Sequence, residues 1–327
     1  MTSATARAYP NIALVKYWGK ADEDLILPVA GSLSMTLDDF PTTTTVTLEE
    51  TDSFSLNHAE QTGKAASRVI TFLDLIRSVA ADAGLDTAKS HARVVSVNEG
   101  PTAAGMASSA SGFAALAVAA SAAYGLELDT RDLSRLARRG SGSASRSLID
   151  RFAVWHAGDD ESSYAEEISA PDMAMIAVPV TTGEKAVSSR AGMVATAETS
   201  PFYPAWITST EEILQEMIAA CKADDFTLIG EISENHALRM HAVIAAARPS
   251  IRYLNSTSIA VFDEIAAMRD EGIEVYGTAD AGPNVFAISR PEDAETVAAR
   301  LVGFTKDNEA KILLPGPGAH LVDGAAE

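Results

Sequence analysis

Apolar and polar residues follow two different periods along the chain, and the period changes from segment to segment. Residues 42–50, TTTTVTLEE, follow Pro41 and are rich in β-branched side chains, which predicts a strand. Between 64 and 84 the apolar side chains recur every three or four residues, so we expect a helix that ends at Gly84. Residues 91–100 alternate between apolar and polar, which predicts another strand.

The second half of the chain is mostly helical in pattern. An apolar run at 173–180 predicts a buried strand, and helical patterns then cover 209–222, 226–247 and 256–271. Residues 273–289 indicate two strands around a turn that contains Gly and Pro. Because strands and helices mix without a strict β-α-β alternation, the pattern predicts an α+β fold.

With 327 residues the chain is long enough for two domains. The character of the sequence changes near 183–190, so we expect one domain at 1–185 and a second at 186–327. We expect the final residues, VDGAAE, to be unstructured.

Residues 101–112, PTAAGMASSASG, join the strand predicted at 91–100 to an apolar helix. A loop of small residues in this position points backbone N–H groups and the positive end of the helix dipole at one place, which suits a phosphate. Ser108 and Ser109 add hydroxyls for phosphate oxygens or Mg²⁺. The segment lacks the G-K-[ST] ending of a Walker loop. A helix cap followed by close helix packing explains the same residues, and the segment alone leaves both interpretations open.

Residues 140–147, GSGSASRS, form a second unusual cluster directly after a predicted helix. If the segment is extended, Ser141, Ser143 and Ser145 project to one side, with Arg146 beside them. Hydroxyls next to a guanidinium suit a carboxylate or a phosphate. A flexible Ser/Gly turn is the alternative.

The chain carries 25 Lys and Arg against 45 Asp and Glu, a net charge of −20. A field of this sign disfavours nucleic acid and anionic membranes as partners. An anionic small molecule therefore needs local groups of basic residues. Such groups occur at Lys16 and Lys20, and again at Lys185 and Arg190. Solvated lysines on a strand are the alternative for the first group.

A few single residues also bear on chemistry. Asp280 lies in the turn TADAGPN, where two strands can present a carboxylate to a cleft, or where the side chain caps the turn. His236 and His241 lie five positions apart on a predicted helix, so helix packing explains them better than a shared metal ion. The single cysteine, Cys221, and the lack of a signal pattern predict a cytoplasmic protein.

In their joint order these segments resemble those of the diphosphomevalonate decarboxylases, a family of the GHMP kinase superfamily. The resemblance covers nearly the whole chain and rests on RAYPNIALVKYWGKADEDLILP, GSLSMTLD, PTAAGMASSASGFAAL, LSRLARRGSGSASRS, SSRAGM and DAGPN. The first and fourth segments are specific to these decarboxylases. The third is shared across the superfamily and indicates ATP binding.

The resemblance implies an ATP- and Mg²⁺-dependent decarboxylation in the mevalonate pathway of isoprenoid biosynthesis. (R)-5-Diphosphomevalonate would be phosphorylated on its 3-hydroxyl and would then lose phosphate and CO₂ to give isopentenyl diphosphate. The implied fold is an N-terminal domain like the second domain of ribosomal protein S5 and a ferredoxin-like C-terminal domain, with the active site between them, in a homodimer. The alternatives are a decarboxylase of mevalonate 5-phosphate and a mevalonate-type kinase without decarboxylation.

The site residues that the resemblance implies fall into three sets. The catalytic residues are Asp280 on the 3-hydroxyl, Arg146 on the C1 carboxylate, and Lys16 near the reacting groups. The substrate-binding residues are Tyr17, Lys20, Ser141, Gly142, Ser143, Arg146, Ser189 and Arg190. The ATP-binding residues are Ala103, Ala104, Gly105, Met106, Ala107, Ser108, Ser109 and Lys185, with Ser109 also near Mg²⁺.

Two positions depart from the family pattern. Phe286 stands where many relatives continue DAGPNV with a lysine, which removes a cation expected near the cleft. Gly31 stands where an asparagine is common before SLS.

Overall fold

The computed structural model describes residues 2–100, 108–181 and 186–326, and it confirms the predicted α+β class. The helices are α1 (Gly63–Asp82), α2 (Ser108–Tyr124), α3 (Thr130–Gly140), α4 (Ser189–Thr199), α5 (Tyr203–Lys222), α6 (Phe226–Ala245), α7 (Ser256–Asp270) and α8 (Ala294–Leu301), with 3₁₀ turns η1 (Asp86–Lys89), η2 (Gly142–Leu148), η3 (Pro291–Asp293) and η4 (Val302–Phe304). Within these ranges no helix has both the length and the apolar composition needed to cross a membrane.

Three sheets and one short hairpin organise the strands. The six-stranded sheet has the order β16 (His320–Val322), β1 (Ser3–Ala8), β6 (Thr42–Glu49), β9 (His91–Asn98), β7 (Ser53–Leu56) and β8 (Ala59–Glu60). The second sheet has the order β11 (Ala165–Glu167), β10 (Phe152–Trp155), β5 (Ser32–Thr36) and β2 (Asn11–Val15). The third has the order β13 (Val275–Thr278), β14 (Val285–Ser289), β12 (Ala174–Val178) and β15 (Lys311–Leu313), and the hairpin pairs β3 (Lys20–Asp22) with β4 (Leu27–Pro28).

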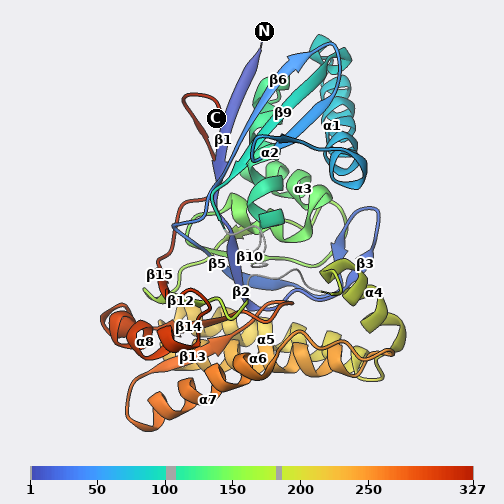
Figure 1. Cartoon of the computed structure of the whole chain (residues 1–327). Coiled ribbons are helices and arrows are strands. Elements are labelled where there is room, and N and C mark those ends of the chain that lie inside the picture. The colour runs from blue at the N-terminus through green and yellow to red at the C-terminus, as the bar shows by residue number, and fades with distance from the viewer. Residues whose placement is uncertain (1, 101–107, 182–185, 327) are drawn as a thin grey trace.

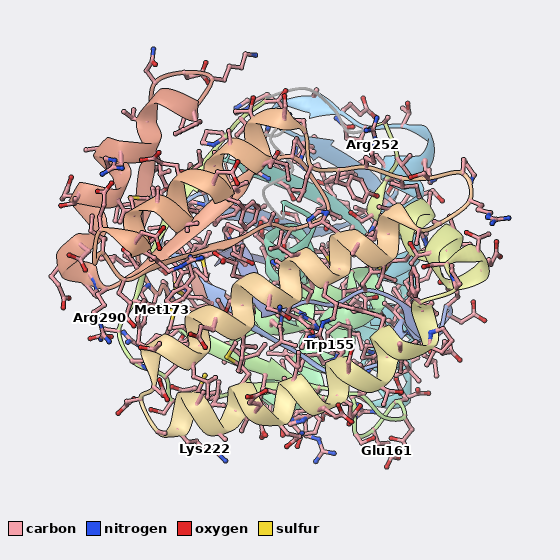
Figure 2. The ribbon with its side chains drawn as sticks, turned by 90° about the horizontal axis from the view of Figure 1, so that it is seen from below. Trp155, Glu161, Met173, Lys222, Arg252 and Arg290 are labelled. Atoms are coloured by element: carbon pink, nitrogen blue, oxygen red, sulfur yellow. The ribbon has the colours of Figure 1, made fainter. Side chains whose placement is uncertain are left out.

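The elements stack in layers, with the six-stranded sheet at one end and the C-terminal helices at the other (Figure 1). Strand β10 separates two of the hydrophobic cores by the alternation of its side chains. Ala153 and Trp155 face the core shared with α1 and α2, whereas Phe152 and Val154 face the core shared with α5 and α6. Viewed from below, long helices of the C-terminal half cover that face of the molecule (Figure 2). The sheet of β2 and β5 therefore lies inside the molecule, where it links the two halves.

Most of the predicted elements are confirmed, and α5 shows where the prediction was incomplete. The helix expected from residue 209 begins at Tyr203, with Pro204 in its first turn. Proline suits this position because the first N–H groups of a helix have no partner within the helix. The boundary predicted between residues 185 and 186 adjoins 182–185, which lie outside the described residues, and it stays a prediction.

The prediction that residues 322–327 are unstructured was wrong. Strand β16 pairs with β1 in antiparallel register, with Val322 opposite Thr5, and the Ala326 N–H donates to Thr45 Oγ1 at 2.7 Å. The position of β1 explains why the tail is ordered. Without β16, the backbone groups of β1 on the side away from β6 would have no strand partner, and such an edge favours pairing with another segment. Both termini consequently lie at the same end of the molecule (Figure 1).

Candidate active site

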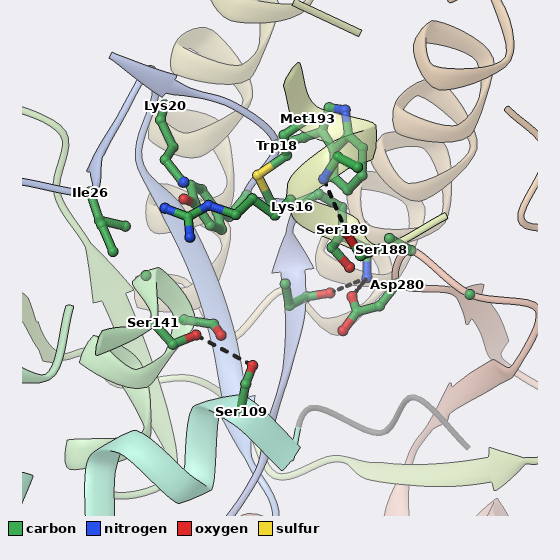
Figure 3. A pocket seen from close by; sticks show the side chains of 18 of the residues that line it. Lys16, Trp18, Lys20, Ile26, Ser109, Ser141, Ser188, Ser189, Met193 and Asp280 are labelled. Carbon is green, nitrogen blue, oxygen red and sulfur yellow. Dashed lines mark hydrogen bonds and ion pairs between the residues drawn. The ribbon is translucent and has the colours of Figure 1, made fainter. Parts of the chain in front are cut away.

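A cleft of about 1180 Å³ brings most of the predicted site residues together (Figure 3). Its walls come from the segment after β2, the starts of α1, α2 and α4, the turn η2, and the turn between β13 and β14. The predicted residues that line it are Lys16, Tyr17, Lys20, Ser109, Ser141, Gly142, Ser143, Arg146, Ser189, Arg190 and Asp280. Residues 103–107 and Lys185, predicted to bind ATP, lie outside the described residues, as does the side chain of Ser108.

Lys16 and Asp280 meet across the two halves of the molecule. Lys16 Nζ lies 2.7 Å from Asp280 Oδ1 and donates to the Ala13 carbonyl at 2.7 Å (Figure 3). The lysine is 1 % exposed, whereas the aspartate is 36 % exposed on its side chain. Burial lowers the pKa of Lys16, and the charge of Asp280 opposes this shift. The pair thus presents a carboxylate at the cleft surface with its counter-ion held behind it.

Arg146 is a buried cation that forms no ion pair among the described residues, although the charge of Asp280 acts on it. Its Nε donates to Ser34 Oγ at 2.9 Å and to Asn11 Oδ1 at 3.2 Å, and its Nη1 donates to Ser32 Oγ at 2.7 Å. In the described part of the chain no carboxylate forms an ion pair with it, and Nη2 has no acceptor. Burial lowers the pKa of Arg146 to about 10. A buried charge is normally paired, so this guanidinium is suited to an anionic ligand in the cleft.

Of the two conformations considered for residues 140–147, the extended one does not occur: Gly140 ends α3, and Gly142–Leu148 form the 3₁₀ turn η2. Ser145 folds back to donate to the Gly142 carbonyl at 2.7 Å, a local bond typical of serine, and it is fully buried. Ser141 and Ser143 still line the cleft.

Tyr17 packs its ring on Trp155 with the ring centroids 4.8 Å apart. Its hydroxyl is buried without a hydrogen-bond partner among the described residues, and burial raises its pKa. A protonated hydroxyl in this state can donate to a ligand oxygen. Gly142 makes the arrangement possible, because a Cβ there would lie 3.0 Å from Tyr17 ring atoms and 2.9 Å from Trp155.

The start of helix α2 lies beside η2. Ser109 Oγ and Ser141 Oγ are 3.3 Å apart (Figure 3), so the hydroxyls predicted for ATP and for substrate are neighbours. With β9 before it and α2 after it, the segment 101–107 joins a strand to a helix as predicted. Within the described ranges, no group of three or more His, Cys, Asp or Glu side chains is placed to hold a metal ion.

Several contributors to the site were missed from the sequence. Asn11, Ser32 and Ser34 hold Arg146 from behind, and the alternation in GSLSMT, which puts both serines on one face, is the signal that could have revealed them. Lys64 and Arg68 line the cleft from α1 at a spacing of four residues. In the sequence alone, two cations four residues apart are equally well explained as solvated charges on a helix face, so the sequence did not indicate that they line a cleft.

The two departures from the family pattern lie away from the cleft lining. Phe286 is 3 % exposed in the core between the second and third sheets, so the expected loss of a cation near the cleft was wrong. Strand β14 begins at Val285, so position 286 is part of the sheet. At Gly31 a Cβ would lie 2.5 Å from Leu214 and 2.8 Å from the Trp155 carbonyl, so this packing excludes a larger residue.

Known proteins of one family are similar to this chain over nearly its whole length. Two family models match: "Diphosphomevalonate decarboxylase-like N-terminal domain" over residues 8–165, and "Mevalonate 5-diphosphate decarboxylase C-terminal domain" over residues 174–315. A diphosphomevalonate decarboxylase of Ganoderma lucidum is 36% identical, over 92% of this chain and 82% of its own. The crystal structure of mevalonate diphosphate decarboxylase from Staphylococcus aureus shares 40% identity over 98% of both chains, with a TM-score of 0.92. A structure described as "MDDEF in complex with MVAPP, AMPPCP and Magnesium" shares 44% identity over 99% of both chains, also with a TM-score of 0.92.

Proposed function

This chain belongs to the diphosphomevalonate decarboxylase family, and on that premise we propose that its cleft binds ATP with (R)-5-diphosphomevalonate and releases isopentenyl diphosphate, ADP, phosphate and CO₂. It is an α+β protein with the two-domain GHMP kinase type of fold. The observation that carries the proposal is the Lys16–Asp280 pair, which shares one cleft with the guanidinium of Arg146, a group without an ion-pair partner in the described ranges.

The reaction requires a leaving group on C3 of the substrate. A β-hydroxy acid has no carbonyl that accepts the electrons released by decarboxylation. Transfer of the ATP γ-phosphoryl group to the 3-hydroxyl supplies the leaving group; the C3–O bond then breaks and the phosphate departs with its electron pair. The C1–C2 electron pair becomes the new C2–C3 double bond as CO₂ leaves. The protein has to align the two phosphate-bearing ligands and orient one hydroxyl.

Each side chain has a role in that alignment. Asp280 accepts a hydrogen bond from the 3-hydroxyl and receives its proton during phosphoryl transfer, while Lys16 balances the carboxylate's charge. Arg146 pairs its free Nη2 with the C1 carboxylate. Lys20 and Arg190 hold the diphosphate, and the hydroxyl of Tyr17 donates to a ligand oxygen.

ATP enters as its Mg²⁺ complex, with its phosphates at the N-terminus of α2. Mg²⁺ in such sites takes most of its ligands from phosphates and water and only one or two from the protein. The hydroxyl of Ser109 suits that arrangement, which needs no acidic cluster.

The test is an assay of Asp280→Asn. We expect loss of ATP-dependent CO₂ release from diphosphomevalonate by at least about a hundredfold, the usual contribution of a general base, while a fluorescent ATP analogue still binds. Turnover close to wild type would refute the role of Asp280. Parallel assays with mevalonate, its 5-phosphate and its 5-diphosphate distinguish the proposed reaction from the two alternatives, and accumulation of a 3-phosphorylated product would indicate a kinase.

A homodimer and a cytoplasmic location are further parts of this proposal. The location is supported by the single cysteine, Cys221, which cannot form an intrachain disulfide.

A further inference from the structure

The two cations proposed for the diphosphate, Lys20 and Arg190, share one acidic neighbour. Lys20 Nζ lies 2.6 Å from Glu23 Oε2, and Arg190 Nη2 lies 3.6 Å from the same oxygen. Lys20 belongs to β3 in the N-terminal half, whereas Arg190 lies in the first turn of α4, and Figure 1 shows β3 and α4 on the same side of the molecule. One carboxylate oxygen therefore bridges the two walls of the cleft.

Two hydroxyl groups on which the charge of Glu23 acts lack hydrogen-bond partners among the described residues. The hydroxyls of Tyr17 and Tyr203 are buried and unpartnered among the described residues. Burial raises the pKa of each tyrosine, and the negative charge of Glu23 adds to the rise. The side chain of Lys20 is only 7 % exposed. These donors and cations define an anion subsite, and in the structure Glu23 supplies its negative charge.

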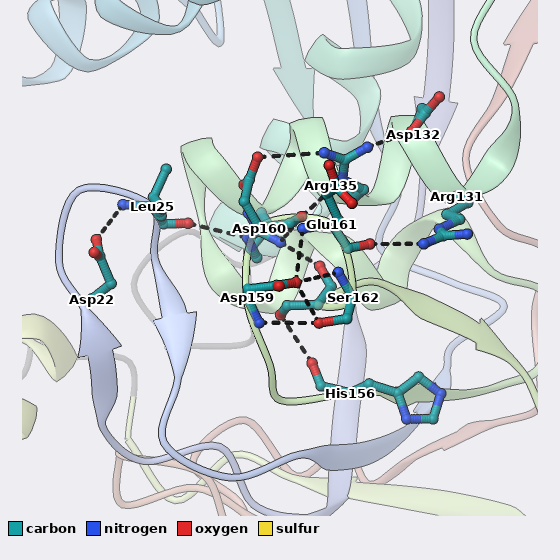
Figure 4. Close-up of polar contacts among 12 residues, drawn as sticks. Asp22, Leu25, Arg131, Asp132, Arg135, His156, Asp159, Asp160, Glu161 and Ser162 are labelled. Carbon is teal, nitrogen blue, oxygen red and sulfur yellow. Dashed lines mark hydrogen bonds and ion pairs between the residues drawn. The ribbon is translucent and has the colours of Figure 1, made fainter.

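The turn that carries Glu23 is held in place, whereas its side chain can move. The Leu25 N–H donates to Asp22 Oδ1 at 2.6 Å (Figure 4), and Arg138 Nε donates to the Leu25 carbonyl at 3.0 Å. Arg138 is fully buried. The Glu23 side chain is 52 % exposed, so it can rotate into solvent without movement of the hairpin between β3 and β4.

We propose that Glu23 is a built-in competitor for the diphosphate: it neutralises Lys20 and Arg190 in the empty cleft, and the phosphate oxygens of the ligand replace it on both cations. The inference rests on the proposed function, which places the diphosphate there. Only counter-ions are exchanged, and no covalent bond changes. A carboxylate attached to the site competes at a high effective concentration, so the exchange favours a multiply charged diphosphate over weaker anions.

The experiment measures binding of inorganic pyrophosphate by titration calorimetry at low ionic strength. Glu23→Gln keeps the size of the side chain and removes its charge. We therefore expect the dissociation constant to fall roughly two- to thirtyfold, because each of the two exposed ion pairs is worth about 0.2–1 kcal/mol. Asp24→Asn is the matched control, because Asp24 is the exposed neighbour and forms no ion pair among the described residues. Its dissociation constant should stay within roughly twofold of wild type.

An unchanged or weaker affinity in Glu23→Gln would overturn the proposal, since Glu23 would then support Lys20 instead of competing for it. Glu23→Asp keeps the charge but shortens the side chain, so it should give a smaller gain. If Glu23→Gln does not fold, the absence of any gain in Glu23→Asp overturns the proposal. The proposed function is judged separately: wild-type protein that fails to convert diphosphomevalonate would contradict it, while the pyrophosphate titration would still decide the role of Glu23.

Discussion

Arg146 holds its positive charge where water has little access, and its Nε and Nη1 nitrogens are already used by Asn11, Ser32 and Ser34. Arg146→Lys keeps the charge, but one ammonium group cannot donate to Asn11, Ser32 and Ser34 and also to a ligand. We expect kcat/KM for diphosphomevalonate to fall about 10- to 100-fold, in line with one charged hydrogen bond, with ATP affinity unchanged. Steady-state kinetics checks this. Arg93→Lys on the surface is the control, and equal effects in the two variants would remove Arg146 from the site.

A second prediction at the scale of single residues concerns Gly142. In Gly142→Ala the new methyl group meets Tyr17 and Trp155 at 2.9–3.0 Å, and overpacking of this kind costs about 1–3 kcal/mol. We expect a lower melting temperature and a higher KM for diphosphomevalonate, because the Tyr17 ring must shift. Gly303→Ala, where a Cβ meets nothing within 4 Å, should change neither. An unaltered KM in Gly142→Ala would show that Tyr17 does not contact the substrate.

Helix α6 reaches across the molecule to hold the backbone that carries Lys16. His236 Nδ1 accepts a hydrogen bond from the Lys16 N–H at 2.9 Å, so in the neutral ring Nε2 carries the proton and donates to Thr210 Oγ1 at 3.1 Å. The ring stacks on Trp206 with centroids 4.6 Å apart. This histidine, expected only to pack its helix, also tethers the segment that bears Lys16, which we propose as a catalytic residue.

His236 makes stability fall in acid. Burial first, and then the charge of Lys16, lower its pKa to about 3 from an ordinary 6.5. Between these values the unfolded chain binds a proton that the folded protein does not, so the free energy of unfolding falls as the pH drops below 6.5. The slope approaches about 1.4 kcal/mol per pH unit for this group. His241, with its pKa lowered by burial to about 4, adds to the same trend.

Urea unfolding at pH 7, 6 and 5 tests this. His236→Asn keeps an oxygen acceptor for the Lys16 N–H and removes the titrating ring, so its unfolding free energy should depend less on pH than that of wild type. His58→Asn, at an exposed turn, is the control for the exchange of a histidine for asparagine. If His236→Asn kept the full wild-type slope, the acid sensitivity would have another origin.

Elements with a clear period were predictable, and those decided by local hydrogen bonds were not. Strand β6 and helix α1 follow from their own side chains, since β-branched runs and helical spacing act within one segment. The conformation of residues 140–147 stayed open in the sequence because it is decided by local bonds such as that from Ser145 Oγ to the Gly142 carbonyl, which no periodicity indicates.

At the scale of the whole molecule, the C-terminal strand β16 forms one edge of the six-stranded sheet. Deletion of residues 320–327 would remove β16 and the Ala326–Thr45 hydrogen bond. We expect a loss of roughly 1–3 kcal/mol, the worth of a few backbone hydrogen bonds, with a lower melting temperature and more self-association through the exposed edge of β1. Differential scanning calorimetry and light scattering check this. Leu321→Pro breaks the pairing without shortening the chain, and an unchanged melting temperature in both variants would contradict the prediction.

The contacts that assemble the site lie beyond what patterns specify. Lys16 and Asp280 are 264 positions apart, and no periodicity indicates which turn meets which strand. The family resemblance grouped them, because it carries the arrangement of a whole fold. It did not indicate Glu23 or His236, whose roles follow from distances in the folded protein.

The pairing of β1 with β16 also sets an order of events during synthesis. Thr5 of β1 and its partner Val322 of β16 are 317 positions apart, so β1 leaves the ribosome long before the strand that pairs with it has been made. Until β16 is synthesised, the nascent chain exposes that edge of β1, where it can associate with other chains. Pairing with β16 ends this exposure.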